Sequence, residues 1–182
     1  MLLLFCHTAF MLTSSETIIL IPTYNEAENI GQIIDRVFAI DPELSVMVLD
    51  DSSPDGTAKI VRGKMSGNSH LHVIERTGDK GFARSYIDGF QRVAEDKRFA
   101  LIITMDADFS HEPKEIPAML SAINRRADMV VGSRYAAGQT FPHISLWRRI
   151  LSRIANRYVQ FILHVPVTDC TSGFIAFRTS LI

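Results

Sequence analysis

The sequence predicts an α/β protein whose mostly parallel sheet is flanked by helices, and three observations support this class. Short β-branched runs alternate with longer stretches in which apolar residues recur at helical spacing. The short runs are continuously apolar, as expected of strands buried on both faces of a sheet. Clusters of polar residues follow directly after several of these runs. This rhythm of strand and helix is typical of βαβ crossovers and therefore of parallel pairing.

The predicted strands, in chain order, are residues 17–21, 45–49, 70–74, 99–105 and 129–131. The predicted helices between them cover about residues 26–40, 57–65, 81–95 and 113–124. Pro22 marks the end of the first strand, and Asp41-Pro42 marks the end of the first helix. The run from Asp50 to Gly56 consists of turn formers and separates the second strand from its helix. Pro113 begins the fourth helix, where proline is tolerated.

A basic amphipathic segment follows at about residues 143–164. Arg149, Arg153 and Arg157 recur every four residues and form a cationic stripe beside a wide apolar face. Such a segment suits a membrane surface or an anionic lipid headgroup. A core helix with one solvated face is the alternative interpretation.

The chain of 182 residues has the size of one domain, which we assign to residues 17–182. Residues 1–16 form an apolar extension before it. Its apolar run of about a dozen residues is shorter than the roughly 20 that cross a bilayer, and it lacks the basic start of a signal peptide. We interpret this extension as loosely packed, with a membrane-touching anchor as the alternative.

The composition excludes several classes of protein. A formal net charge of −1 gives no support to nucleic acid as a partner, so any charged partner must meet a local patch. Two cysteines, Cys6 and Cys170, make neither a disulfide framework nor a metal cluster. Reduced thiols and a cytoplasmic location are therefore expected.

Polar clusters follow four of the predicted strands. They are Thr23-Tyr-Asn-Glu26, Asp50-Asp51, Asp106-Ala-Asp108 and Gly132-Ser-Arg134. Ligands of parallel sheets bind at the carboxyl ends of the strands, so these clusters are the candidate site. The first strand is followed by neither a Gly-x-Gly-x-x-Gly fingerprint nor a Walker A loop. Any phosphate group must therefore be held by a metal ion and by arginines.

Asp106 and Asp108 are the candidate metal ligands. Two carboxylates at positions i and i+2, just past a buried strand, can converge on one divalent cation. Their hard oxygen atoms suit Mg²⁺ or Mn²⁺, which would bridge a nucleotide diphosphate and neutralise the charge of the leaving group. A turn in which both acids only cap the following helix is the alternative.

The other clusters suggest nucleotide contacts. Asp51 is the candidate to accept hydrogen bonds from a base edge or a ribose, because Asp50 must point away from it on an extended backbone. Tyr24 is expected to stack on a base, and Glu26 to hold a hydroxyl group. A helix start is the alternative for Tyr24 and Glu26. Arg134 and Arg148 are expected to grip an acceptor phosphate, because guanidinium groups bind phosphate in a bidentate way.

Taken together, these motifs resemble a known family. They are Pro22-Thr-Tyr-Asn-Glu26, Asp50-Asp-Ser-Ser-Pro-Asp-Gly-Thr57, Met105-Asp-Ala-Asp108, Gly132-Ser-Arg-Tyr135, Trp147-Arg148 and Thr171-Ser-Gly-Phe174. Their order and spacing closely resemble the polyprenyl-phosphate (dolichyl-phosphate) mannose synthases, which are family 2 glycosyltransferases with a GT-A fold. The resemblance covers residues 17–182.

The resemblance implies inverting transfer of mannose from GDP-mannose to a polyprenyl phosphate, by a protein peripheral to the cytosolic face of a membrane. A membrane domain or subunit is a possible partner. The residues implied to line the nucleotide are Pro22, Tyr24, Glu26, Leu49 and Asp51. Those implied to hold the diphosphate and metal are Asp106, Ala107 and Asp108, with Ser110 in place of the family's glutamine. Those implied to hold the phosphates of acceptor and donor are Arg134 and Arg148, with Ser152 nearby.

The residues also bear on the acceptor. A sugar hydroxyl acceptor needs a general base, whereas a phosphomonoester with a second pKa of about 6 is already largely anionic. The Glu-Asp base pair that many family 2 enzymes carry after the metal motif is absent there, since Glu95-Asp96 precedes it. Two alternatives stay open: a glucosyl or N-acetylhexosaminyl transferase that uses a UDP sugar, and an inactive nucleotide-binding fragment. Relatives continue past Phe174 for several more elements, so a C-terminally truncated domain is expected.

Overall fold

The structure is a computed structural model that describes residues 11–133, 146–163 and 169–182. In the helix at 146–163 it describes the side chains of Trp147, Ile154 and residues 156–162 only. The strands are β1 (Thr17–Thr23), β2 (Ser45–Asp50), β3 (Leu71–Glu75), β4 (Leu101–Thr104), β5 (Met129–Val131) and β6 (Ile175–Arg178). The helices are α1 (Ile30–Ile40), α2 (Thr57–Met65), α3 (Phe82–Glu95), α4 (Ile116–Asn124) and α5 (Leu146–Leu163). Short 3₁₀ turns span Ser14–Glu16, Pro113–Glu115 and Thr179–Leu181.

The six strands form one sheet in the order β3-β2-β1-β4-β6-β5. Strands β1 to β4 pair in parallel, which confirms the predicted sheet. Strand β6 was not predicted, and it lies antiparallel between β4 and β5, with Ile103 opposite Ala176. Strand β6 is only four residues long, and an apolar run as short as Ile175–Phe177 does not by itself distinguish a strand from a helix.

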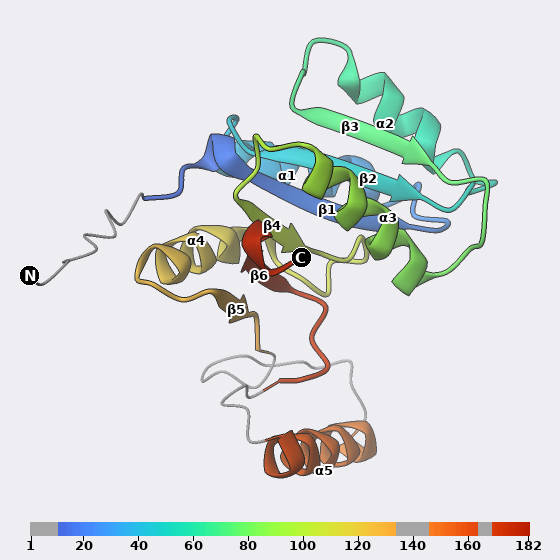
Figure 1. Cartoon of the computed structure of the whole chain (residues 1–182). Helices are drawn as coiled ribbons and strands as arrows, with labels where there is room; N and C mark the ends of the chain where they lie inside the picture. Colours follow the sequence, from blue (N-terminus) through green and yellow to red (C-terminus); the bar gives the residue numbers. More distant parts are fainter. Residues whose placement is uncertain (1–10, 134–145, 164–168) are drawn as a thin grey trace, which may run out of the picture.

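Helices cover both faces of the sheet (Figure 1). Ile19 and Ile21 of β1 pack in a core with α1, α2 and α4, whereas Ile18 and Leu20 pack with α3 on the other face. All seven residues of β1 are buried, as the continuous apolar run predicts for a central strand. Strand β1 is therefore an interior strand of the sheet, buried on both faces and paired with β2 and β4.

Several element boundaries differ from the prediction at the carboxyl ends of the strands. Strand β1 continues through Pro22 to Thr23, because Pro22 still pairs in register with Leu49. Helix α1 begins at Ile30 rather than near Glu26, and a turn occupies the residues between. Residues 24–29 therefore lie outside the helix, where they can contact the loops that follow other strands.

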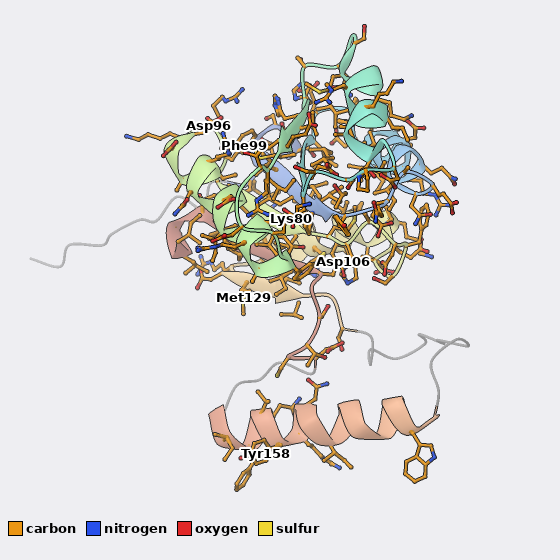
Figure 2. The ribbon with its side chains drawn as sticks, turned by 90° about the vertical axis from the view of Figure 1, so that its right-hand side faces the viewer. Lys80, Asp96, Phe99, Asp106, Met129 and Tyr158 are labelled. Atoms are coloured by element: carbon orange, nitrogen blue, oxygen red, sulfur yellow. The ribbon has the colours of Figure 1, made fainter. Side chains whose placement is uncertain are left out.

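Residues 11–16 and α5 lie at the margins of this core. The backbone N–H of Leu12 donates to Asn124 Oδ1 at 2.8 Å, and Asn124 Nδ2 donates back to the Leu12 carbonyl at 3.1 Å, so the chain is packed against the end of α4 from Leu12 onward. Helix α5 lies apart from both faces of the sheet (Figure 1), and the view in Figure 2, turned by 90°, shows the same separation. Among the described helices, none combines the length and apolar character needed to cross a bilayer.

Candidate functional site

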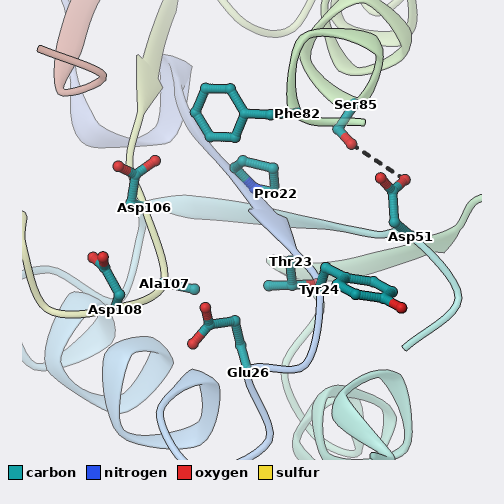
Figure 3. A pocket seen from close by; sticks show the side chains of 10 residues that line it. All are labelled: Pro22, Thr23, Tyr24, Glu26, Asp51, Phe82, Ser85, Asp106, Ala107 and Asp108. Atoms are coloured by element: carbon teal, nitrogen blue, oxygen red, sulfur yellow. Dashed lines mark hydrogen bonds between the residues drawn. The ribbon is translucent and has the colours of Figure 1, made fainter. Parts of the chain in front are cut away.

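A pocket of about 300 Å³ lies at the carboxyl ends of β1, β2 and β4, beside the start of α3 (Figure 3). It is lined by Pro22, Thr23, Tyr24, Glu26, Asp51, Phe82, Ser85, Asp106, Ala107 and Asp108. Three of the four predicted clusters thus meet in one cavity, although they are far apart in the sequence. Figure 3 shows Asp106 and Asp108 on one side of the pocket and Asp51 with Tyr24 on the other. The pocket therefore has an acidic end and an end with an aromatic ring.

The acidic end has the donor set of a hard divalent cation. Asp106 is half-buried and Asp108 is exposed, so both carboxylates can be reached from the pocket. Partial burial raises the pKa of Asp108, but hydrogen bonds from the Ser110 side chain and backbone outweigh it and leave the pKa below its ordinary value. This carboxylate is therefore ionised at neutral pH. Two carboxylates are a partial coordination shell, and phosphate oxygens of a ligand would complete it.

Three further observations define this acidic end. Within the described ranges, no group of three or more His, Cys, Asp and Glu side chains has metal-binding geometry. The Ser110 N–H donates to Asp108 Oδ1 at 2.9 Å, and Ser110 is exposed outside the pocket lining. Burial, together with the charge of Asp106, raises the pKa of Tyr86, so the phenol near this carboxylate stays protonated.

The loop after β1 is tied to the loop after β2 by three consecutive backbone donors. The N–H groups of residues 25, 26 and 27 donate to Ser53 Oγ at 3.0 Å, Thr57 Oγ1 at 3.0 Å and Asp55 Oδ2 at 2.9 Å. The three acceptors are Ser53, Asp55 and Thr57, which are every second residue in the turn-forming run after β2. Tyr24 and Glu26 are held at the pocket by this contact rather than by a helix start.

Asp50 and Asp51 point in opposite directions, as expected for neighbours at a strand end. Asp50 is fully buried, and its Oδ1 accepts from Thr23 Oγ1 at 2.9 Å and from Ser53 Oγ at 2.6 Å. Asp51 faces the pocket, and its Oδ2 accepts from the Gly81 N–H at 2.7 Å. Asp50 is therefore structural, and Asp51 is the residue of the pair that can meet a ligand.

Arg76 supports the site from outside the pocket, and it was not among the residues predicted from the sequence. Its guanidinium forms a buried ion pair with Asp51 and donates to Ser85 Oγ at 3.0 Å and to Asp88 Oδ2 at 2.7 Å. Arg76 follows β3 directly, so the same strand-end rule that selected Asp51 applies to it. Phe82 and Ser85 were also missed, and they belong to the first turn and a half of α3.

The remaining predicted residues lie in several environments. Pro22 and Ala107 line the pocket, whereas Leu49 is fully buried in the core under α3, so its side chain does not. Arg134 lies outside the described residues, and Arg148 and Ser152 lie on α5 with side chains outside them. Lys80, not singled out from the sequence, places its ammonium 5.4 Å from the centroid of the Tyr24 ring.

Left-handed backbone conformations occur in each of the three loops that form the pocket. Asn25 after β1, Ser52 after β2 and Phe109 after β4 have φ angles of 61°, 53° and 60°. Such conformations are costly for residues other than glycine, and they concentrate where a site demands them. The Phe109 ring is held by the Arg36 guanidinium, 4.6 Å from its centroid. Each loop thus turns sharply at the rim of the pocket.

The sheet order, the antiparallel β6 and the acidic pair after β4 define a GT-A glycosyltransferase fold. A solved mannosyltransferase from Pyrobaculum calidifontis superposes with a TM-score of 0.57 at 21% identity, covering 91% of this chain and 45% of that one. The family model described as glycosyl transferase family 2 matches residues 18–182. The chain belongs to glycosyl transferase family 2.

Two curated relatives are identical to the chain at more than a third of the aligned positions. A polyprenol monophosphomannose synthase of Mycolicibacterium smegmatis is 36% identical over 170 residues, which is 93% of this chain and 64% of the relative. An undecaprenyl-phosphate mannosyltransferase of Micrococcus luteus is 36% identical over 159 residues, which is 87% of this chain and 65% of the relative. The chain therefore spans slightly less than two thirds of the length of each.

Proposed function

We propose that this chain is the catalytic part of an inverting glycosyltransferase that moves mannose from GDP-mannose to a polyprenyl phosphate. The observation that carries the proposal is the meeting of Asp106 and Asp108 with Tyr24, Glu26 and Asp51 in one pocket. An acidic end for a metal-bound diphosphate and an aromatic end for a base are the two requirements of a nucleotide-sugar donor. One curated relative is named as a polyprenol monophosphomannose synthase, and the other as an undecaprenyl-phosphate mannosyltransferase.

In this proposal Asp106 and Asp108 hold Mg²⁺ or Mn²⁺, with Asp108 as the principal ligand and Ser110 orienting it. The solved mannosyltransferase is described in complex with GDP-Man and Mn²⁺, which supports both the donor and the ion. When bound, the ion neutralises the charge that develops on the departing diphosphate. Ala107 and Pro22 shape the wall between the two ends, and Asp51 receives hydrogen bonds from the base or the ribose.

The transfer is a single displacement. A phosphate oxygen of the acceptor forms a bond to the anomeric carbon of mannose while the bond from that carbon to the GDP oxygen breaks, and GDP leaves with the electron pair. The acceptor oxygen needs no general base, because a phosphomonoester is mostly ionised at neutral pH. The chain therefore has to position the two reactants and stabilise charge, and the configuration at the anomeric carbon is inverted. We assign the grip on the acceptor and donor phosphates to Arg134 and Arg148.

Helix α5 is proposed to bring the site to the lipid. Its described apolar side chains are largely exposed, at 81% for Trp147, 67% for Tyr158 and 76% for Phe161, while Arg157 adds a positive charge. A helix with exposed aromatic residues and basic side chains suits the interface of a membrane with anionic lipids. The protein would then work as a peripheral protein at the cytosolic face of the membrane, alone or with a membrane partner.

A donor panel tests the proposal. Purified protein, vesicles containing polyprenyl phosphate and Mn²⁺ are incubated with labelled GDP-mannose, UDP-glucose or UDP-N-acetylglucosamine, and the extracted lipid is counted. Label from GDP-mannose alone is expected, with Asp108→Ala and Arg134→Ala at background. Label from a UDP sugar alone contradicts the mannose assignment. GDP binding without any lipid product would identify the chain as an inactive nucleotide-binding fragment.

A further inference from the structure

His111 lies behind the acidic pair rather than in the pocket. Its side chain is 7% exposed, and it is not among the residues that line the cavity. Its Nδ1 accepts a hydrogen bond from the backbone N–H of Asp106 at 2.9 Å. Because Nδ1 accepts, the ring carries its proton on Nε2. The His111 side chain therefore links the two ends of the loop from Asp106 to His111.

This hydrogen bond fixes the point where the strand ends and the acidic loop begins. Asp106 is the second residue after β4, and Met105 before it still donates to the Leu20 carbonyl of β1 at 3.0 Å. The Asp106 N–H is thus the first donor that the sheet no longer uses. The bond to His111 thus holds the backbone of Asp106, and the bond from the Ser110 N–H to Asp108 Oδ1 holds the second carboxylate, both from within the loop.

The imidazole is held in turn by the segment that contains β6. Its ring stacks on Phe174, with centroids 5.1 Å apart and planes inclined by 13°. Phe174 is 4% exposed, and its carbonyl accepts from the Gly132 N–H at 2.7 Å. Thr104 Oγ1 donates to the Gly173 carbonyl at 2.7 Å, so the end of β4 is bound to the same segment. The orientation of His111 is therefore set by residues far from it in the sequence.

The imidazole and the Asp106 carboxylate both lie beside the backbone of Gly173. A methyl group at Gly173 would lie 3.4 Å from His111 Cε1 and 3.5 Å from both carboxylate oxygens of Asp106. The Asp106 carboxylate and the imidazole therefore pack against one backbone position. A change in the ring is transmitted to the carboxylate directly, through contact as well as through the backbone hydrogen bond.

We propose that His111 is a positioning residue for the divalent cation: it presents the Asp106 carboxylate through the hydrogen bond at Nδ1, with Phe174 as the support of its ring. This inference rests on the proposed function, in which Asp106 and Asp108 hold the metal of the donor complex. Groups that orient metal ligands without touching the metal typically change metal affinity by about 10–100-fold when they are replaced.

Two substitutions test the hydrogen-bond acceptor and the aromatic ring of His111 separately. His111→Phe keeps an aromatic ring against Phe174 but removes the acceptor, whereas His111→Asn places an amide oxygen near the position of Nδ1 and removes the ring. Mn²⁺ is titrated into protein with saturating GDP, and free Mn²⁺ is followed by its electron paramagnetic resonance signal. We expect His111→Phe to raise the Kd for Mn²⁺ by about 10–100-fold and His111→Asn to recover most of this loss.

Thermal unfolding of each variant and a matched control complete the experiment. His70→Phe makes the same change just before β3, at the opposite end of the strands, and should leave the Mn²⁺ affinity unchanged. His111→Phe with a lowered melting temperature but wild-type Mn²⁺ affinity overturns the proposal, because the role would be structural only. Equal losses in His111→Phe and His111→Asn overturn the role of the acceptor. Wild-type protein that binds no Mn²⁺ with GDP overturns the proposed function itself, and this inference with it.

Discussion

Asp51, which lines the pocket, forms a buried ion pair with Arg76, which does not. The Asp51 side chain is 8% exposed and the Arg76 side chain is 5% exposed. The pair joins the end of β2 to the residue after β3, and hydrogen bonds to Ser85 and Asp88 extend it to α3. A charge this far from water is stable only while its partner remains. The carboxylate offered to the ligand therefore depends on an arginine outside the pocket.

Removal of Arg76 should destabilise the protein strongly. Arg76→Leu leaves Asp51 as an uncompensated buried charge, and we expect a loss of about 3–5 kcal/mol in the free energy of unfolding, measured by urea denaturation. Arg98→Leu is the matched control, because the Arg98–Asp96 pair is exposed and its loss should not be measurable. Equal stabilities of the two variants would show that Asp51 does not depend on Arg76.

The tie between the first two loops depends on one hydroxyl group. Thr57 is fully buried, and its Oγ1 accepts from the Glu26 N–H and donates to Asp55 Oδ1 at 2.6 Å. Valine has the same shape as threonine, but Thr57→Val leaves the Glu26 N–H without this acceptor. We expect the free energy of unfolding to fall by about 1–3 kcal/mol and GDP binding to weaken. Thr57→Ser keeps the hydroxyl and should retain GDP binding in isothermal titration. Wild-type affinity in Thr57→Val would disprove the role of this contact.

A methyl group should be tolerated at one glycine and not at another. At Gly132 it would lie 2.7 Å from Phe174 Cδ1, which is shorter than any normal contact, so we expect Gly132→Ala to cost about 1–3 kcal/mol. At Gly63, inside α2, nothing lies within 4 Å, and alanine should stabilise the helix by about 0.5–1 kcal/mol. Melting temperatures that shift in opposite directions are the expected result; a shift in the same direction would contradict the packing around Phe174.

The contribution of Asp55 should depend on pH in a defined direction. A hydrogen bond from the Thr57 side chain, with others from the backbone of Ala27 and Thr57, lowers the pKa of Asp55 from its ordinary value of 3.8. A depressed folded-state pKa means that the carboxylate stabilises the fold above the unfolded-state pKa and loses this effect as the pH falls through the folded-state value. The difference in melting temperature between wild type and Asp55→Ala should therefore shrink below about pH 4. A difference that stays constant from neutral to acidic pH would argue against these hydrogen bonds.

The sequence predicted the parallel half of the sheet well, because buried strands and amphipathic helices leave strong local patterns. The position of Asp106 and Asp108 at the pocket followed from the same patterns, since carboxyl ends of parallel strands share one edge. The turn at Asn25 did not follow: the sequence predicted a helix from about Glu26, whereas the backbone is left-handed at Asn25 and its N–H donates to Ser53 in the loop after β2.

What the sequence could not predict depends on pairings between distant residues. Arg76 was missed because its role is defined by Asp51, which lies 25 positions earlier, and by α3 after it. The role proposed for His111 did not follow from the sequence either, because its ring is oriented by Phe174, which lies 63 positions later in the chain. No local pattern encodes these partners, and they appear only once the sheet is assembled.

The position of β6 has a consequence for how the protein assembles during synthesis. Among the described strands it comes last along the sequence, yet it lies between β4 and β5. Until residues 175–178 leave the ribosome, β5 has, among the strands described, no neighbour to pair with, and β4 presents an open edge. Closing a loop of about 70 residues from β4 to β6 is slow compared with local pairing. We therefore expect the block β3-β2-β1-β4 to form before the acidic loop gains its support from Phe174.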